Sequence, residues 1–211
     1  MTDAREVVLD RIRAALSDRP AARPVPRDYA TALPSDTDAV DLFARRVADY
    51  RATVHLTAAA DLARVVASVL TDWGVRRLVV PAGIPDRWLA ETPAAVARVG
   101  DDPALDKPDL DAMDAVITDC AVAIAETGTI VLDGRPSQGR RVLSLLPDRH
   151  LCVVAADRIV GTVPEALTQL DPRRPQTWIS GPSATSDIEL ERVEGVHGPR
   201  TLDVIIVRAD G

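Results

Sequence analysis

Residues 114–134, DAVITDCAVAIAETGTIVLDG, contain three short apolar runs separated by polar residues. Val, Ile and Ala dominate these runs at 114–117, 121–125 and 129–132, and β-branched residues favour strands. Apart from Asp114 and Thr129 at their starts, the runs are apolar and do not alternate with polar residues, which is typical of strands covered on both faces. The stretch therefore predicts buried strands in an α/β fold.

The sequence on either side continues this pattern and inserts helices between the strands. Helical periodicity covers residues 39–50 and 58–73, with Thr57 as the expected N-cap and Gly74 as the expected stop. Further β-rich runs occupy residues 53–56, 75–80, 96–100, 151–155, 177–180 and 202–207. Together these elements predict a three-layer α/β sandwich with a mostly parallel sheet.

The N-terminal part of the chain has a different character. Residues 3–16 show apolar residues at helical spacing, and Asp3 followed by Glu6 has the spacing of a capping box. Four prolines follow between residues 17 and 35, where they interrupt regular structure. We expect a helical appendage with a proline-rich tether at 1–36 and an α/β domain at 37–211. The helix could dock on its own domain or on a partner subunit, and the sequence leaves both alternatives open.

Composition and charge exclude several classes of protein. The formal net charge of −7 and pI of about 5.0 oppose binding to nucleic acid or to an anionic membrane. The first residues mix charged and apolar side chains, so they predict neither a secretory signal nor a membrane span. We therefore expect a cytoplasmic protein whose anionic ligands, if any, are bound by local arginines.

The cysteines and histidines predict neither a metal centre nor a bound cofactor. Cys120 and Cys152 lie in apolar surroundings without a CxxC neighbour, and the three histidines are scattered. An iron–sulfur cluster needs about four thiolates, and a structural zinc site needs four ligands at close spacing. The chain is thus expected to hold no iron, zinc or cofactor by itself.

The first candidate for chemistry is the turn Glu126-Thr127-Gly128-Thr129. A carboxylate beside a glycine at a strand end can act as a nucleophile or general base, because glycine lets a substrate approach the backbone. A tight turn with a solvated Glu126 explains the same residues.

A second candidate is the loop GRPSQGRR at residues 134–141. Its glycines have P-loop spacing, but arginines replace the Lys and Ser/Thr that bind phosphate and magnesium, which excludes a nucleoside triphosphatase. Arg140 and its neighbours could still clamp a carboxylate or phosphate. A solvated basic loop is the alternative.

A third candidate is SGPSATSDIE at residues 180–189. Ser186 and Glu189 have capping-box spacing, so a helix is expected to begin near Asp187. Its free N–H groups, together with Gly181, Ser183 and Thr185, would bind an anion. A capped helix without a ligand accounts for the same spacing.

The fourth candidate is His197 with Gly198, just before the last strand. Histidine titrates near neutrality and can serve as an acid or base. A lone loop histidine is also compatible with a structural role.

Four motifs stand in one order over residues 121–207, namely AVAIAETGTIVLDG, RRVLSLLPDRHLCVVAADRIV, SGPSATSDIE and GVHGPRTLDVIIV. With these motifs the chain resembles the LUD-domain family, and LDRIRAAL and VPRDYA extend the resemblance to the N-terminal part. The resemblance implies a fold like that of CoA transferases, ribose-phosphate isomerases and glucosamine-phosphate deaminases. It also implies a part in oxidising L-lactate to pyruvate, with iron–sulfur proteins as partners.

Three functions remain open from the sequence. In the first, the chain is the non-iron–sulfur component of an L-lactate oxidation system and binds an anionic small molecule or a partner protein around Glu126, Ser183, Asp187 and His197. In the second, it is an acyl transferase or hydrolase resembling CoA transferases, with Glu126 as nucleophile and Asp187 or His197 as acid and base. In the third, it is a non-catalytic adaptor.

Overall fold

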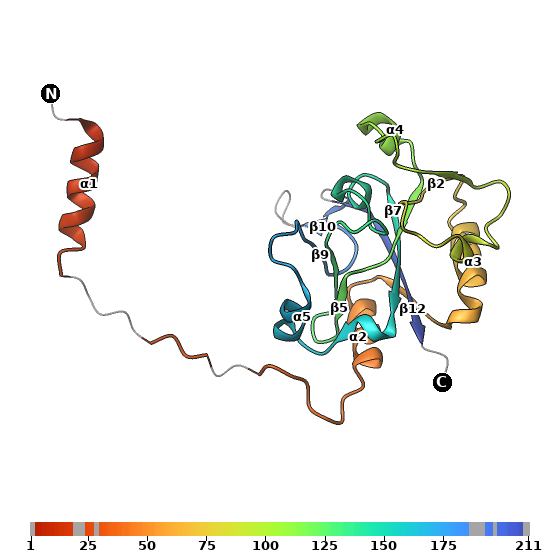
Figure 1. Ribbon diagram of the computed structural model, residues 1–211, viewed down its shortest axis with the longest axis horizontal. Coiled ribbons are helices and arrows are strands. Elements are labelled where there is room, and N and C mark those ends of the chain that lie inside the picture. The colour runs from red at the N-terminus through yellow and green to blue at the C-terminus, as the bar shows by residue number, and fades with distance from the viewer. Residues whose placement is uncertain (1–2, 19–23, 28–29, 186–192, 196–197, 209–211) are drawn as a thin grey trace. The chain divides into compact units, whose positions relative to one another are not determined.

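The computed structural model (Figure 1) describes the chain except for six short stretches. The described residues are 3–18, 24–27, 30–185, 193–195 and 198–208. The chain divides into two units, Met1–Ala30 and Thr31–Gly211, and each is described by itself below.

The first unit contains helix α1, Ala4–Ala15. Asp3 caps it, because its carboxylate accepts a hydrogen bond from the backbone N–H of Arg5 at 3.1 Å. The helix predicted at 3–16 is therefore confirmed. None of its residues is buried, so its apolar side chains contribute no core within this unit.

The second unit begins within the proline-rich tether. Thr31 accepts a hydrogen bond at its carbonyl from the Thr162 hydroxyl (2.8 Å), and Leu33 packs against a buried apolar cluster. Thr31 and Leu33 thus attach the start of the second unit to Thr162 and to this cluster. A domain boundary after residue 36 remains a prediction.

A six-stranded sheet, parallel throughout, forms the centre of this unit. In spatial order its strands are β1 (Thr53–Ala58), β12 (Thr201–Arg208), β7 (Arg149–Ala155), β4 (Ala115–Thr118), β2 (Arg77–Val79) and β3 (Ala97–Val99). Because all six strands run the same way, their carboxyl ends meet along one edge. The predicted α/β class with a mostly parallel sheet is confirmed.

Alternate residues of the central strands pack into different layers. Val153 and Ile205 face helix α3, Leu62–Asp72, and the 3-10 helix η2, Asp86–Leu89. The next residues, Val154 and Ile206, face helix α2, Ala39–Asp49, and a second sheet. This period of two explains why the strands are apolar throughout, since both faces of the sheet are covered.

The second sheet is mixed and four-stranded. Its order is β8 (Ile159–Val160), β5 (Val122–Ile124), β6 (Thr129–Leu132) and β9 (Thr177–Ile179). Helix α5, Val163–Gln169, covers its outer face and begins with a capping box between Thr162 and Glu165. Two of the three runs in residues 114–134 therefore form an antiparallel pair in this sheet. The apolar pattern predicted these strands but did not indicate that they belong to a second sheet.

The remaining elements are short. They are η1 (Ala59–Asp61), α4 (Lys107–Asp111), η3 (Arg141–Ser144), η4 (Ala156–Arg158), and the antiparallel pair β10 (Ala184–Thr185) and β11 (Val193–Glu194). No described helix has both the length and the apolar character needed to cross a membrane.

Of the two predictions for the ends of α3, the stop at Gly74 is confirmed and the N-cap at Thr57 is wrong. Gly74 ends the helix in the left-handed region, with φ at 64°. Thr57 is not its N-cap, however, because β1 continues through Thr57 to Ala58 and η1 intervenes before α3. No side chain caps the start of η1 or of α3. The pairing of β1 with β12 up to Ala58 prevailed over the local capping preference of Thr57.

Candidate functional site

The carboxyl ends of β1, β4, β7 and β12 enclose a cleft of about 520 Å³, here called the edge cleft. Its apolar walls come mainly from Ala59, Leu62, Ala63, Trp88, Val153 and Val207. Its charged side chains are Arg87, Asp119, Asp157 and Arg158. In open α/β sheets, ligands bind in crevices at this edge.

One wall of the edge cleft is the start of the η1–α3 segment, which follows directly from β1. Ala59, Ala60 and Ala63, whose side chains are small, line the cleft on this side. Since no side chain caps η1 or α3, N–H groups at this start lack an internal side-chain acceptor. The positive end of the helix dipole adds to the attraction for an anion.

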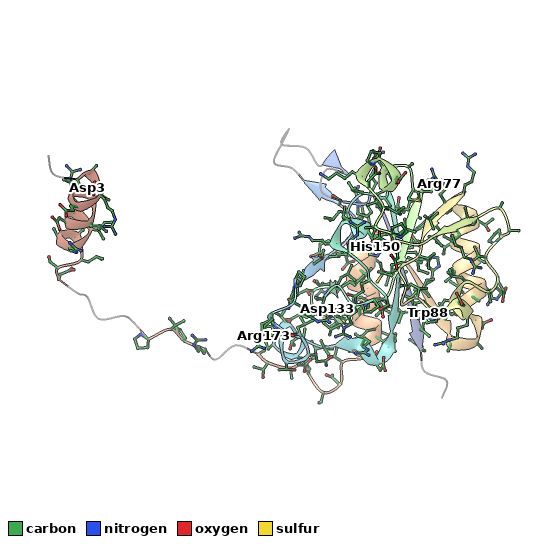
Figure 2. The ribbon with its side chains drawn as sticks, turned by 45° about the horizontal axis from the view of Figure 1, so that its top comes forward. Asp3, Arg77, Trp88, Asp133, His150 and Arg173 are labelled. Carbon is green, nitrogen blue, oxygen red and sulfur yellow. The ribbon has the colours of Figure 1, made fainter. Side chains whose placement is uncertain are left out.

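The 3-10 helix η2, which packs against α3, also places side chains at the cleft. Leu89 is buried and anchors η2 in the core. Trp88 is half-buried and packs against the same cluster while lining the cleft. Figure 2 shows Trp88 beside α3. Arg87 is exposed next to it.

The charged groups of the edge cleft lack internal partners. Arg87 and Arg158 are exposed, and neither guanidinium has an ion pair or hydrogen bond within the part of the chain that the structure describes. The Asp119 carboxylate likewise has none there, and its Oδ1 atom is shielded from solvent. A buried polar atom without a partner is uncommon and calls for water or a ligand as its missing partner.

Cys120 also lines the edge cleft but is unsuited to nucleophilic chemistry. The residue is 4% exposed, and burial raises its thiol pKa well above the ordinary value, with further increases from Cys152 and Asp119. Burial likewise raises the pKa of Cys152 to about 12. Both thiols stay protonated near neutral pH, whereas nucleophilic attack and metal binding need the thiolate.

Beneath the cleft, His150 is a core residue. It is buried in β7, where burial lowers its pKa to about 4. Its Nε2 atom lies 2.8 Å from the Thr118 hydroxyl. A neutral histidine satisfied by a threonine explains this position without a catalytic role.

A second cleft, here called the arginine cleft, lies at the carboxyl ends of β2 and β3 and has a volume of about 680 Å³. Its arginines are Arg135, Arg140, Arg141 and Arg174. The predicted loop 134–141 supplies three of them. Its backbone approaches Gly83 so closely that a Cβ atom there would lie 2.4 Å from the Ser137 nitrogen.

Most of these arginines are already paired. Arg140 donates two hydrogen bonds of 2.6 Å to the Asp101 carboxylate and another to the Leu105 carbonyl. This pair lowers the pKa of Asp101, mainly through the hydrogen bonds from Arg140. Arg135 and Arg174 approach the buried Asp133 carboxylate at 3.0 and 3.6 Å. The arginine clamp predicted at Arg140 is therefore occupied by a protein carboxylate.

The Glu126 turn docks on α2. Glu126 is exposed, and its backbone N–H donates to the Gly161 carbonyl at 3.0 Å. Gly128 has a φ of 59°, and a Cβ atom there would lie 2.8 Å from the carbonyl carbon of Arg46. The glycine is thus required by a turn packed tightly against a helix, and Glu126 lines neither the edge cleft nor the arginine cleft.

The structure brings some of the predicted residues together. The Thr129 hydroxyl lies 2.7 Å from that of Thr127 and 2.8 Å from that of Ser180, next to Gly181. Ser183 and Gly198 line a separate hollow with Gly181. That hollow adjoins the residues just before β12, at the amino edge of the sheet. The hollow shares Arg141 with the arginine cleft, where Arg140 lies.

Other predicted residues cannot be placed. Ser186, Asp187, Glu189 and His197 lie outside the described residues, and so does the helix expected near Asp187. Thr185 belongs to β10. An anion site built from these residues stays a prediction.

Sequence reasoning missed Arg87, Trp88, Asp119 and Arg158. Asp119 directly follows the apolar run that becomes β4, and Arg158 lies three residues beyond β7. Polar residues just after parallel strands gather at one edge. Applying this rule to each predicted strand would have found Asp119 and Arg158, whereas Arg87 and Trp88 depend on how η2 folds back onto α3.

Comparison with known proteins places this fold in a family. The model of the LUD domain matches residues 40–207. The chain belongs to the LUD-domain family. Within the family, it is 48% identical over 200 residues to a lactate utilization protein C of Deinococcus radiodurans, covering 92% of this chain and 91% of that protein.

More distant LUD-domain relatives and a solved structure agree with this assignment. A lactate utilization protein C of Geobacillus kaustophilus is 28% identical over 173 residues, covering 72% of this chain and 70% of that protein. A crystal structure of a DUF162 family protein from Deinococcus radiodurans matches with a TM-score of 0.67 and 42% identity. It covers 80% of this chain and 96% of the solved chain.

Proposed function

We propose that this LUD-domain protein is the non-iron–sulfur component of an L-lactate utilization system and that it binds an anionic small molecule in the edge cleft. The names of its relatives support the role in lactate utilization. The observation that carries the binding role is the pair of arginines, Arg87 and Arg158, that line the cleft without partners among the described residues.

The cleft suits an anion through its two arginines, although Asp119 and Asp157 also line it. The whole chain carries a net charge of −7, so its long-range field repels anions. Attraction must come from groups at short range, and guanidinium forks are well matched to carboxylates and phosphates. The uncapped start of η1 and α3 lies in the same cleft, and its positive dipole end also attracts an anion.

Electron transfer would fall to iron–sulfur proteins acting with this chain in the cytoplasm. The chain has only two cysteines, and burial raises the pKa of both thiols. A cluster needs about four thiolates. A division of labour follows, in which this chain binds and positions a ligand while its partners carry the redox centres.

Growth on L-lactate tests the proposal directly. A strain lacking the native gene is complemented with the wild-type chain, with Arg158→Gln, or with the control Arg76→Gln, an exposed arginine at the amino end of β2. We expect Arg158→Gln to slow growth on L-lactate but not on a sugar, and Arg76→Gln to behave as wild type. Normal growth of the deletion strain on L-lactate would refute the role, and full complementation by Arg158→Gln would remove the edge cleft from it.

A further inference from the structure

We propose that the edge cleft binds a nucleoside phosphate, free or as the end of a larger cofactor, and not L-lactate itself. The inference rests on the proposed anion-binding role of this cleft and names the ligand class. Three features carry it: the size of the cleft, the unpaired Asp119 carboxylate, and the arrangement of arginines around an apolar wall that includes Trp88.

Size argues against lactate as the sole occupant. L-lactate has about six non-hydrogen atoms and occupies roughly four water volumes, or about 120 Å³ at about 30 Å³ per water. The cleft has a volume of about 520 Å³, so lactate would leave most of it filled with water. Clefts of roughly 300–1,000 Å³ enclose much larger molecules, and a nucleoside mono- or diphosphate lies in that range.

Asp119 lines the cleft and favours a ligand that carries hydrogen-bond donors. An ionised carboxylate only accepts hydrogen bonds, and this one has no partner among the described residues, with Oδ1 shielded from solvent. It directly follows β4 at the carboxyl edge. A carboxylate after a parallel strand is the group that accepts from ribose hydroxyls in nucleotide-binding α/β folds. Pyruvate offers no donor, and L-lactate and the hydrogen phosphate dianion offer one hydroxyl each, whereas a ribose offers two neighbouring hydroxyls.

The other walls suit the two ends of a nucleotide. Arg87, Arg158 and the uncapped η1–α3 start can receive the phosphate. Trp88 lines the cleft while half-buried, and an indole of this kind can pack against a planar base. The chain has no GxGxxG loop, so phosphate binding here depends on arginines in place of a glycine-rich turn.

The test is calorimetric titration of the full-length protein with ADP, NAD, CoA, inorganic phosphate and L-lactate. We expect at least one of the three nucleotides to bind at least tenfold more tightly than phosphate and L-lactate. Preference for ADP indicates a free nucleotide, and preference for NAD or CoA indicates a larger cofactor. Binding of phosphate or L-lactate as tight as that of every nucleotide, or no nucleotide binding at all, overturns the inference.

Variants connect the binding to the cleft. Arg158→Gln should weaken nucleotide binding by about 10- to 100-fold, the usual effect of losing a charge-assisted hydrogen bond. Asp119→Asn, which keeps the side-chain size, should weaken nucleotide binding about tenfold and leave phosphate binding unweakened. Unchanged nucleotide affinity in both variants overturns the inference, and thermal unfolding checks that each is folded.

The outcomes separate this inference from the proposed function. If Arg158→Gln impairs growth on L-lactate but no nucleotide binds, the ligand class is wrong and the role of the cleft remains. If nucleotides bind but the deletion strain grows normally on L-lactate, the nucleotide site in the edge cleft is supported and the role in L-lactate utilization is refuted. Arg76→Gln serves as the common control in both experiments.

Discussion

The edge cleft and the arginine cleft lie along the same edge of the sheet, and both contain arginines, yet their electrostatic states differ. In the arginine cleft, Arg140 is held by Asp101 through two hydrogen bonds of 2.6 Å. In the edge cleft, Arg87 and Arg158 have no partner among the described residues. The comparison separates the number of arginines in a cleft from their availability, because ion pairs within the protein occupy three of the four in the arginine cleft.

The physical reason is competition between carboxylates. An anionic ligand that binds Arg140 must displace Asp101, which leaves that carboxylate without its partner. Arg141 is the one arginine of that cleft without an ion pair among the described residues. The same ligand in the edge cleft displaces only water from the two arginines. For ligands of equal charge the edge cleft should therefore bind more tightly, because no existing ion pair is lost.

The largest expected effect comes from Gly83, where the loop 134–141 crosses the strand ends between the two clefts. Its backbone N–H donates to the Pro136 carbonyl at 3.0 Å, and a Cβ atom would lie 2.4 Å from the Ser137 nitrogen. Gly83→Ala should lower the free energy of unfolding by about 1–3 kcal/mol, since backbone must move. Denaturant unfolding measures it.

Gly100→Ala is the matched control, because Gly100 borders the arginine cleft and a Cβ atom there meets nothing within 4 Å. This variant should be neutral or slightly more stable. Equal stability of the two variants would show that the loop is not held at Gly83 and would weaken the distinction between the clefts.

A smaller effect is expected from Arg140→Gln. The side chain is half-exposed while Asp101 is mostly buried, so the loss should be about 1 kcal/mol at neutral pH. Arg140 lowers the pKa of Asp101, so its stabilisation is present above the unfolded pKa of about 3.9 and is lost as pH falls through the folded value. The stability difference between wild type and variant should therefore shrink below about pH 4.

Urea unfolding at several pH values measures this difference. Nucleotide titration of the same Arg140→Gln protein sharpens the comparison, because affinity at the edge cleft should stay within about threefold of wild type. A large loss of affinity would mean that the two clefts act as one site.

Glu126→Gln tests whether the function depends on the predicted turn at Glu126 or on the clefts. Glu126 is exposed and lines neither cleft, so the variant should complement growth on L-lactate at the wild-type rate. The amide preserves size, and the turn is held by Gly128 and the backbone hydrogen bond to Gly161. Loss of growth with an intact fold would instead favour an enzyme that uses Glu126 as nucleophile, with Asp187 or His197 as acid and base.

The smallest effect is expected from removing residues 1–30. Neither cleft includes a residue before Ala59, so ligand affinity should be unchanged and the free energy of unfolding should stay within about 0.5 kcal/mol. Removal of residues 1–36 should cost about 1–2 kcal/mol more, because Thr31 and Leu33 contact the second unit. Equal stability of the two truncated proteins in thermal unfolding would contradict this difference.

The sequence alone determined the local elements of this protein. Asp3 at the start of α1 and Gly74 at the end of α3 act through their own backbone and nearest turns. The apolar runs at 114–117 and 151–155 are long enough and β-rich enough to specify buried strands wherever they pair. Helix caps and apolar strand patterns can be predicted from the sequence because they depend on residues only a few positions apart.

Tertiary structure alone decided which strands pair and which charges are neutralised. The runs at 121–125 and 129–132 look like the central strands, but they form a second sheet because helices α2 and α5 cover it. Arg140 meets Asp101 across 39 positions of sequence. The Asp119 carboxylate in the edge cleft, by contrast, has no partner among the residues that the structure describes. Ion pairs and clefts depend on contacts between distant segments, and these form only when the sheets close on each other.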